Sequence, residues 1–297
     1  MSASDKPLPY RGDGSVPEGS SPATRNERGK YLADSQLVSA VNTALLVEQP
    51  LLVTGEPGTG KTALAWSVAS ELGLGSVLEF HTRSDHQASD ALYEIDHLLR
   101  FYHAQVHDER ATHPELYVRW NALGEAIRSP VRRVVLIDEI DKAPRDFPND
   151  LLDEIDQMEF SVPSLNMKFT ATERPIVIIT SNSERQLPDP FLRRCVFHRI
   201  EFPKADRLEQ ILRERLGHLN LAQQLLDVAI RRFEEVRALP ALEKKPATGE
   251  LIAWVNVLSA TGVTAEALKG LAASQLPSPG LLAKTEQDAR LLNQATG

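Results

Sequence analysis

The residues from Gly55 to Thr62 have the types and the spacing that bind a nucleotide phosphate. They read GEPGTGKT, they follow the apolar run 50–54, and a segment with helical apolar periodicity comes next. In such a strand–loop–helix arrangement, glycines let backbone N–H groups turn toward phosphate oxygens, the lysine reaches the β- and γ-phosphates, and the threonine hydroxyl ligates Mg²⁺. The predicted nucleotide-binding residues are Gly55, Glu56, Pro57, Gly58, Thr59, Gly60, Lys61, Thr62 and Ala63.

Two acids, Asp138 and Glu139, end the apolar run that begins at Val134. An unbroken apolar run is typical of a central parallel strand, whose carboxyl end faces the ligand crevice. We therefore predict that Asp138 binds the nucleotide's Mg²⁺ together with Thr62. Glu139 is predicted to orient and deprotonate the water that attacks the γ-phosphate. The alternative is an acid pair that only ends a strand.

Three further polar residues follow along the chain. Asn182 comes at the end of the apolar run 175–180, where its amide would position the attacking water; the alternative is an asparagine that only forms a turn. Arg193 and Arg194 follow a short predicted helix. An arginine supplied by a neighbouring subunit stabilises charge on the γ-phosphate and accelerates hydrolysis by ~10³ or more. A pair of surface salt bridges is the alternative.

A pair of lysines, Lys244 and Lys245, directly precedes a predicted helix at 249–259. A cation at this position would reach the nucleotide phosphates from a neighbouring helical domain, and Lys245 is the predicted one. The alternative is that both lysines are simply exposed, as lysines usually are.

The elements that must position these residues divide the chain into four regions. Residues 1–30 are rich in Ser, Pro, Gly and charge, which predicts a flexible tail or an extended arm. Residues 31–203 alternate apolar runs with helical periodicity, which predicts an α/β domain with a parallel sheet. Strands then disappear, so 204–277 is predicted to be a small all-helical domain. The weakly patterned residues 278–297 are predicted to form a tail or a helix.

Composition excludes several classes of protein. The formal net charge of −8 argues against a chain that coats nucleic acid or an anionic membrane. Cys195 is the single cysteine and fits a reducing compartment, and the first thirty residues contain no apolar signal segment. No apolar stretch approaches the ~20 residues that a spanning helix needs. We predict a cytoplasmic protein that contacts no membrane.

The motifs at 55–62, 134–141, 180–182 and 192–194 together resemble those of the AAA+ ATPases in order and spacing. An insertion after the second predicted strand and a predicted β-hairpin at 159–172 are similar to the MoxR branch of that superfamily. The resemblance implies a parallel P-loop αβα domain followed by a helical lid. It also implies ATP and Mg²⁺ as cofactors and a ring, usually a hexamer, whose nucleotide sites lie between subunits.

By this resemblance Asn182 is the sensor 1 residue and Arg194 the arginine finger that acts on the neighbouring site, with Arg193 as the fallback. The finger is ambiguous by one residue, because the chain reads LRRC where MoxR proteins read LDRF. Only Lys244 or Lys245 is available where the family has an arginine, called sensor 2, that couples closure of the helical lid to hydrolysis.

The function that the resemblance implies is ATP-driven, chaperone-like remodelling of a client protein, often with a von Willebrand factor A domain protein as companion. The hairpin at 159–172 and the histidine-rich insertion at 81–113 are the candidate client contacts. Two alternatives stay open at this point. One is a P-loop kinase or phosphotransferase, and the other is a nucleotide-gated scaffold with little hydrolysis.

Overall fold

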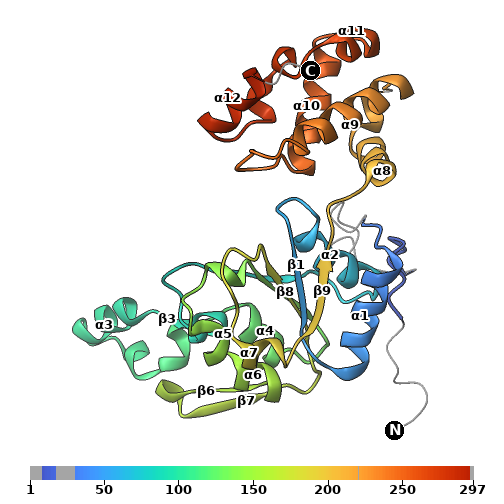
Figure 1. Cartoon of the computed structure of the whole chain (residues 1–297). Coiled ribbons are helices and arrows are strands. Elements are labelled where there is room, and N and C mark those ends of the chain that lie inside the picture. Colours follow the sequence, from blue (N-terminus) through green and yellow to red (C-terminus); the bar gives the residue numbers. More distant parts are fainter. Residues whose placement is uncertain (1–8, 18–30, 220, 295–297) are drawn as a thin grey trace. The chain divides into compact units, whose positions relative to one another are not determined.

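The structure is a computed structural model that describes residues 9–17, 31–219 and 221–294 (Figure 1). Its contacts divide the chain into two compact units. The first comprises residues 1–55 and 60–200, and the second comprises 56–59 and 201–297. The short stretch Glu56–Thr59 therefore packs with the second unit, although it is part of the predicted phosphate loop.

The first unit is built on a five-stranded sheet with the strand order β2-β5-β8-β1-β9. All of its strand pairs are parallel. The three central strands are buried along their whole length, as expected for aliphatic runs that helices cover on both faces. The strands are β1 Leu51–Gly55, β2 Leu78–His81, β5 Val134–Asp138, β8 Ile176–Ser181 and β9 Val196–Ile200.

Helices cover both faces of this sheet and make an αβα sandwich (Figure 1). Alternate residues of β1 point to opposite faces. Leu51 and Val53 therefore belong to a core with α1 and α2, whereas Leu52 belongs to a core with α4 and α6. The predicted α/β class is confirmed. The helices are α1 Ser35–Val47, α2 Lys61–Glu71, α4 Ala122–Arg128, α5 Phe147–Asp150, α6 Leu152–Gln157 and α7 Asp189–Leu192, with a 3₁₀ turn η6 Ile140–Lys142.

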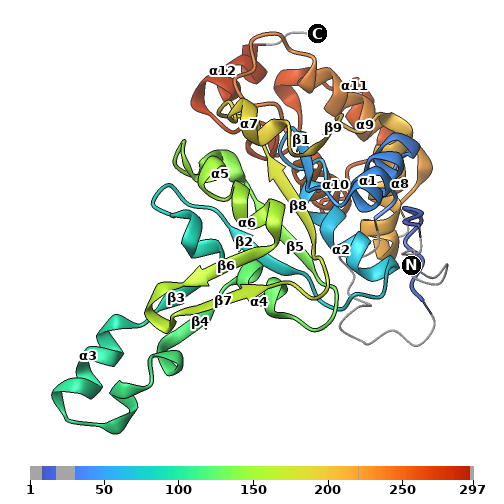
Figure 2. The same cartoon turned by 90° about the horizontal axis from the view of Figure 1, so that it is seen from below.

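The chain between β2 and α4 forms an arm that extends away from the sheet, at the lower left of Figure 2. Its two strands pair antiparallel at the base. His103 is buried and its Nδ1 lies 2.7 Å from the hydroxyl of Tyr117. Across the described part of the chain, no group of three or more His, Cys, Asp or Glu could hold a metal ion. The arm's elements are η3 Ala88–Ala91, β3 Tyr93–Ile95, α3 His97–Gln105, η4 Glu109–Thr112, η5 Pro114–Tyr117 and β4 Val118–Trp120.

The expected β-hairpin is formed by β6 Glu159–Val162 and β7 Met167–Thr170, joined by η7 Pro163–Leu165. An aromatic cluster of Tyr93, Trp120, Phe160 and Phe169 joins the hairpin to the base of the arm. The ring centroids of Trp120 and Phe169 are 5.1 Å apart, and those of Tyr93 and Phe160 are 6.1 Å apart. The Arg128 guanidinium stacks 3.9 Å from the centre of the Trp120 ring. The two candidate client contacts therefore share one packed base.

In the described part of the predicted tail or arm, residues 9–17, the chain is anchored to the first unit. Tyr10 is only 1% exposed and belongs to the core that includes α1 and α2. The sequence suggested a tail because this segment is short and polar, but a single buried aromatic anchors it. The other residues of the predicted tail, 1–8 and 18–30, lie outside the described residues.

The second unit is helical and has its own core, with the indole of Trp254 at its centre. Trp254 is fully buried and its Nε1 donates a hydrogen bond to the Pro277 carbonyl at 2.8 Å. Leu292 of the last helix is buried in the same core, so residues beyond 277 pack with this unit. Its elements are α8 Ala205–Leu216, η8 Gly217–Leu219, α9 Gln223–Arg237, α10 Thr248–Ala260, α11 Ala265–Gly270, η9 Ala273–Gln275, η10 Pro279–Leu281 and α12 Glu286–Gln294.

Among the described residues of both units, no helix combines the length and the apolar character that crossing a membrane requires.

Candidate functional site

The phosphate loop joins β1 to α2, as its sequence predicts. Gly58 and Gly60 have φ angles of +76° and +93°, a region that glycine adopts at little cost. Gly60 is the N-cap of α2, so the positive end of an eleven-residue helix begins at Lys61. The Lys61 ammonium is buried and donates a hydrogen bond to the Gly55 carbonyl at 2.8 Å. The loop thus holds its own lysine at the place where a phosphate group would be bound.

Thr62 and Asp138 lie together, as predicted. The Thr62 hydroxyl donates to the Asp138 carboxylate, with Oγ1 3.2 Å from Oδ1 and 3.4 Å from Oδ2. Asp138 is 8% exposed, and His81 from the adjacent strand places its Nδ1 3.3 Å from Oδ2. A hydroxyl and a carboxylate are the hard oxygen ligands that Mg²⁺ prefers. These two side chains therefore fit the metal that the motif implies.

The backbone at Glu139 turns sharply, because its φ is +56°. This left-handed conformation is uncommon for a residue with a side chain, and such residues concentrate at functional sites. The Glu139 N–H donates to the Thr180 hydroxyl at 2.9 Å. The same hydroxyl donates to Asp138 Oδ1 at 2.5 Å. One buried threonine on the neighbouring strand therefore fixes both acids.

Two side chains orient the Glu139 carboxylate. Asn182 Nδ2 donates to Oε1 at 3.1 Å, and Lys142 Nζ donates to Oε2 at 2.5 Å. The pKa of Lys142 is raised, chiefly because its ammonium donates to Glu139. Asn182 is itself held by the buried Asp141, whose Oδ1 accepts the Asn182 N–H at 3.2 Å. Asp141 also accepts the Glu184 N–H at 3.0 Å, so it ties the loop after β8 to the loop after β5.

The two predicted finger arginines differ in their contacts. Arg194 forms an ion pair with Asp156 on α6. Arg193 is exposed, and its side chain has no hydrogen-bond or ion-pair partner in the part of the first unit that the structure describes. A hollow bordered by both arginines, Asp189 and Pro190 lies at this position.

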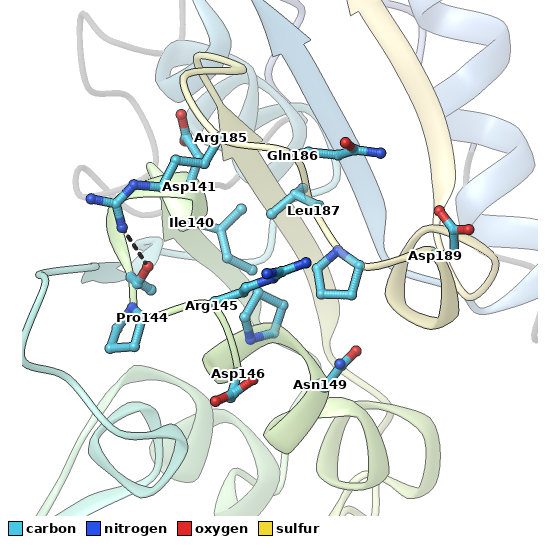
Figure 3. Close-up of a pocket in the computed structure, with 13 residues that line it drawn as sticks. Ile140, Asp141, Pro144, Arg145, Asp146, Asn149, Arg185, Gln186, Leu187 and Asp189 are labelled. Carbon is cyan, nitrogen blue, oxygen red and sulfur yellow. Dashed lines mark hydrogen bonds between the residues drawn. The ribbon is translucent and has the colours of Figure 1, made fainter.

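A cavity of about 700 Å³ lies between the loop after β5 and the loop after β8 (Figure 3). Arg185 bridges the two loops, since its Nη1 donates to the Ala143 carbonyl at 3.3 Å. The cavity does not involve the phosphate loop, but Asp141, which holds Asn182, is one of its lining residues. Its other lining residues are Ile140, Ala143, Pro144, Arg145, Asp146, Pro148, Asn149, Arg185, Gln186, Leu187, Pro188 and Asp189.

In the second unit, Lys244 and Lys245 have exposed side chains. Arg237 of this unit contacts the phosphate-loop residue Glu56, with Nη2 2.6 Å from Oε2. Its guanidinium also stacks 3.4 Å from the centre of the Phe202 ring. Arg237 was not predicted from the sequence, because it is the last residue of the regular amphipathic helix α9, where an arginine is common and carries no distinguishing pattern.

Thr180, His81 and Asp141 were not predicted from the sequence either. A signal for the first two existed, because parallel strands in register bring their carboxyl ends to one edge. His81 of β2 is the register partner of Asp138, and Ile179 of β8 is the partner of Ile137, so Thr180 follows directly beside Asp138. For Asp141 no signal existed, since its role depends on how the loop after β8 folds back.

The fold and this geometry define a nucleotide-binding P-loop protein with a pair of acids beside the phosphate loop. Residues 51–204 of the 297 match the family described as the ATPase family associated with various cellular activities (AAA). The chain belongs to this family, whose members bind and hydrolyse ATP.

Solved structures with a similar fold include RuvB from Thermotoga maritima, described as a Holliday junction branch migration motor, at 16% identity and a TM-score of 0.48. A mutant form of that protein matches at 14% identity and a TM-score of 0.50. In both comparisons the match covers 78% of this chain and 65% of the RuvB chain. The second likeness supports an AAA+ fold. A search of curated proteins gave no match.

Proposed function

We propose that the protein is a Mg²⁺-dependent ATPase of the MoxR-like branch that assembles into a hexameric ring and remodels a client protein. The observation that carries the hydrolytic part is the orientation of Glu139. Asn182 holds one of its carboxylate oxygens and Lys142 the other, beside the Thr62–Asp138 pair. A kinase needs no glutamate aimed in this way at a water, and a non-hydrolysing scaffold needs none either.

Each residue then has a chemical task. The Lys61 ammonium exchanges the Gly55 carbonyl for phosphate oxygens, and the amides of Gly55–Ala63 complete the phosphate cradle. Thr62 and Asp138 would hold Mg²⁺, which would neutralise charge on the phosphates. The Glu139 carboxylate orients the attacking water and accepts its proton, while the Asn182 amide keeps the carboxylate in place. Removing the proton as the oxygen attacks is the step that the site is built to promote.

The ring is proposed because neither finger arginine contacts Asp138 or Glu139 in the described part of the first unit. Arg193 and Arg194 lie after α7, at a surface hollow, and are proposed to act on the neighbouring subunit's nucleotide. For the second unit, Lys245 remains the proposed phosphate contact. Arg237 is the second candidate, because it already pairs with a residue of the phosphate loop.

The client remodelling is proposed from surface chemistry. The arm's helix α3 exposes Leu98, Phe101 and Tyr102 by 84%, 63% and 60% of their areas, and apolar side chains grouped on one helix mark a surface that binds another protein. The hairpin shares the arm's base and exposes Met167 at its turn. We propose a protein client, with a von Willebrand factor A domain protein as companion, and a cytoplasmic location.

The substitution Glu139→Gln tests the proposed chemistry. The amide keeps the size of the side chain and cannot accept the proton, so ATP turnover should fall by about 100-fold or more while ATP binding persists. Steady-state phosphate release and equilibrium ATP binding measure the two quantities. Glu214→Gln, an exposed residue of α8, is the matched control and should change neither. If Glu139→Gln hydrolyses ATP at the wild-type rate, Glu139 is not the base.

A further inference from the structure

The N-terminal strap, residues 10–14, forms hydrogen bonds with α1, which precedes β1, and with α2, which follows the phosphate loop. The Tyr10 N–H donates to Asn42 Oδ1 at 2.9 Å, and Asn42 Nδ2 donates back to the Tyr10 carbonyl at 2.8 Å, which fixes the strap on α1. The Tyr10 hydroxyl lies 2.9 Å from Ser67 Oγ on α2. The helix that receives this contact is the one that begins with Lys61.

A buried carboxylate at the end of α2 closes the strap over the helix. Glu71 is 7% exposed, and its two oxygens accept the backbone N–H groups of Arg11, Gly12 and Gly14 at 3.0, 3.0 and 2.9 Å. Burying a carboxylate is costly unless hydrogen bonds replace its hydration. These three N–H groups supply that replacement. Glu71 and the strap therefore depend on each other.

The strap in turn fixes the segment that leads into α1. The Ala33 N–H donates to the Gly12 carbonyl at 2.8 Å. There is no room for a side chain at Gly12, because a Cβ would lie 2.6 Å from Ala33 Cβ and 2.7 Å from Val38 Cγ2. The segment from Tyr31 to Asp34 is therefore held between the strap and the start of α1.

This segment touches the phosphate loop through one ring. A Cβ built on Gly60 would lie 2.7 Å from Tyr31 Cε2, so the tyrosine ring fills the space beside the loop's last glycine. Gly60 has a φ of +93°, which a glycine can leave easily when nothing restrains it. Contacts thus lead from Glu71 through the strap to Ala33, and the backbone from Ala33 leads to Tyr31, whose ring contacts Gly60.

We propose that Tyr31, held in place by the strap and Glu71, is a positioning residue that keeps the phosphate loop in its nucleotide-binding conformation. A glycine-rich loop that is free before binding loses conformational entropy when it closes on phosphate, and a preorganised loop loses less. The Tyr31 ring supplies this preorganisation at Gly60. The inference rests on the proposed binding of ATP at this loop.

The test compares two ligands, Mg·ATP and inorganic tripolyphosphate with Mg²⁺, by equilibrium titration. In Tyr31→Ala and in Glu71→Gln, both ligands should bind about tenfold more weakly, because the loop binds the phosphate groups, which both ligands have, and not the adenine base. Tyr31→Phe keeps the ring and should bind both ligands normally. The double variant should lose little more than either single variant, since both act through one chain of contacts. Leu46→Ala, a 78% exposed residue on α1, is the control and should have no effect.

Three outcomes would overturn the inference. A loss of affinity for ATP alone would mean that the Tyr31 side chain contacts the adenine base of the nucleotide. Unchanged affinities for both ligands would mean that the loop needs no support from Tyr31. If the loss of affinity in the double variant equals the sum of the free-energy losses in the two single variants, Glu71 and Tyr31 act separately. If Glu71→Gln fails to fold, Gly12→Ala displaces the strap without altering α2 and should give the same loss of affinity. If the wild-type protein binds neither ligand, the proposed function itself fails.

Discussion

At the scale of single residues, one buried hydroxyl organises the two acids of the site. Thr180 has no exposed surface; it donates to Asp138 and accepts the N–H of Glu139, whose φ of +56° needs such support. Thr180→Val keeps the shape of the side chain and removes both hydrogen bonds. It should lower the free energy of unfolding by about 1–3 kcal/mol, because the Glu139 N–H and the buried Asp138 carboxylate each lose a partner. We expect the ATP turnover number to fall about tenfold or more, because the two acids lose the contact that positions them and a rise of ~1.4 kcal/mol in the activation free energy slows the reaction tenfold. Thermal unfolding and steady-state hydrolysis measure the two effects. Thr180→Ser should restore turnover, and an equal loss in the serine variant would contradict this role.

The choice between the two finger arginines is also a matter of single residues. Arg194 is held in an ion pair by Asp156, whereas Arg193 is exposed and unpaired among the described residues. The structure therefore favours Arg193, the fallback of the two, as the residue available to a neighbour. Arg193→Ala should lower turnover by ~10³ at full assembly, and Arg194→Ala should lower it much less. Hydrolysis measured at protein concentrations well above those needed for assembly compares the two variants. A larger loss of turnover in Arg194→Ala than in Arg193→Ala would identify Arg194 as the arginine finger.

At the scale of elements, the sequence predicted what depends on local pattern. Continuous aliphatic runs predicted the central strands. The position of Asp138 and Glu139 at the carboxyl end of β5 followed from the run that ends in these two acids. What could not be predicted depends on distant segments meeting. The carboxylate of Glu71 gives no sign in the sequence that it will bind residues 11–14, and Tyr10 lies alone in a polar stretch.

The arm and the hairpin meet in an aromatic cluster, and this predicts how they respond to a core deletion. Phe160 is 4% exposed and contacts Tyr93, Trp120 and Phe169. Phe160→Ala should destabilise this region by about 3–5 kcal/mol, because a buried ring leaves a cavity. Amide hydrogen exchange should rise in β3, β4, β6 and β7 together while ATP binding stays intact. Phe101→Ala, at an exposed position on α3, is the control and should leave exchange unchanged. Faster exchange in β6 and β7 alone would show that the arm folds independently.

At the scale of the whole molecule, each proposed nucleotide site belongs to two subunits. In this proposal, Glu139 and Lys61 act on the nucleotide that their own subunit binds, whereas the finger arginine, Arg193 or Arg194, acts on the neighbour's. In a ring with head-to-tail interfaces, each subunit then contributes to two different sites.

This division predicts that two inactive variants rescue each other when mixed. A Glu139→Gln subunit still offers its arginines, and an Arg193→Ala/Arg194→Ala subunit still has its glutamate. In randomly mixed rings with equal amounts of each, about one quarter of the interfaces combine an intact glutamate with intact arginines, so activity should recover toward that fraction.

Mixing Glu139→Gln with Lys61→Ala is the matched control. Complete sites would form in that mixture only if Lys61 and Glu139 served different nucleotides; because both serve the same one, no activity should return. Hydrolysis measured after exchange of subunits decides between the outcomes. No recovery in the arginine mixture would place the arginines in the same site as Glu139 within one chain, whereas recovery in the control would mean that Lys61 and Glu139 serve different nucleotides.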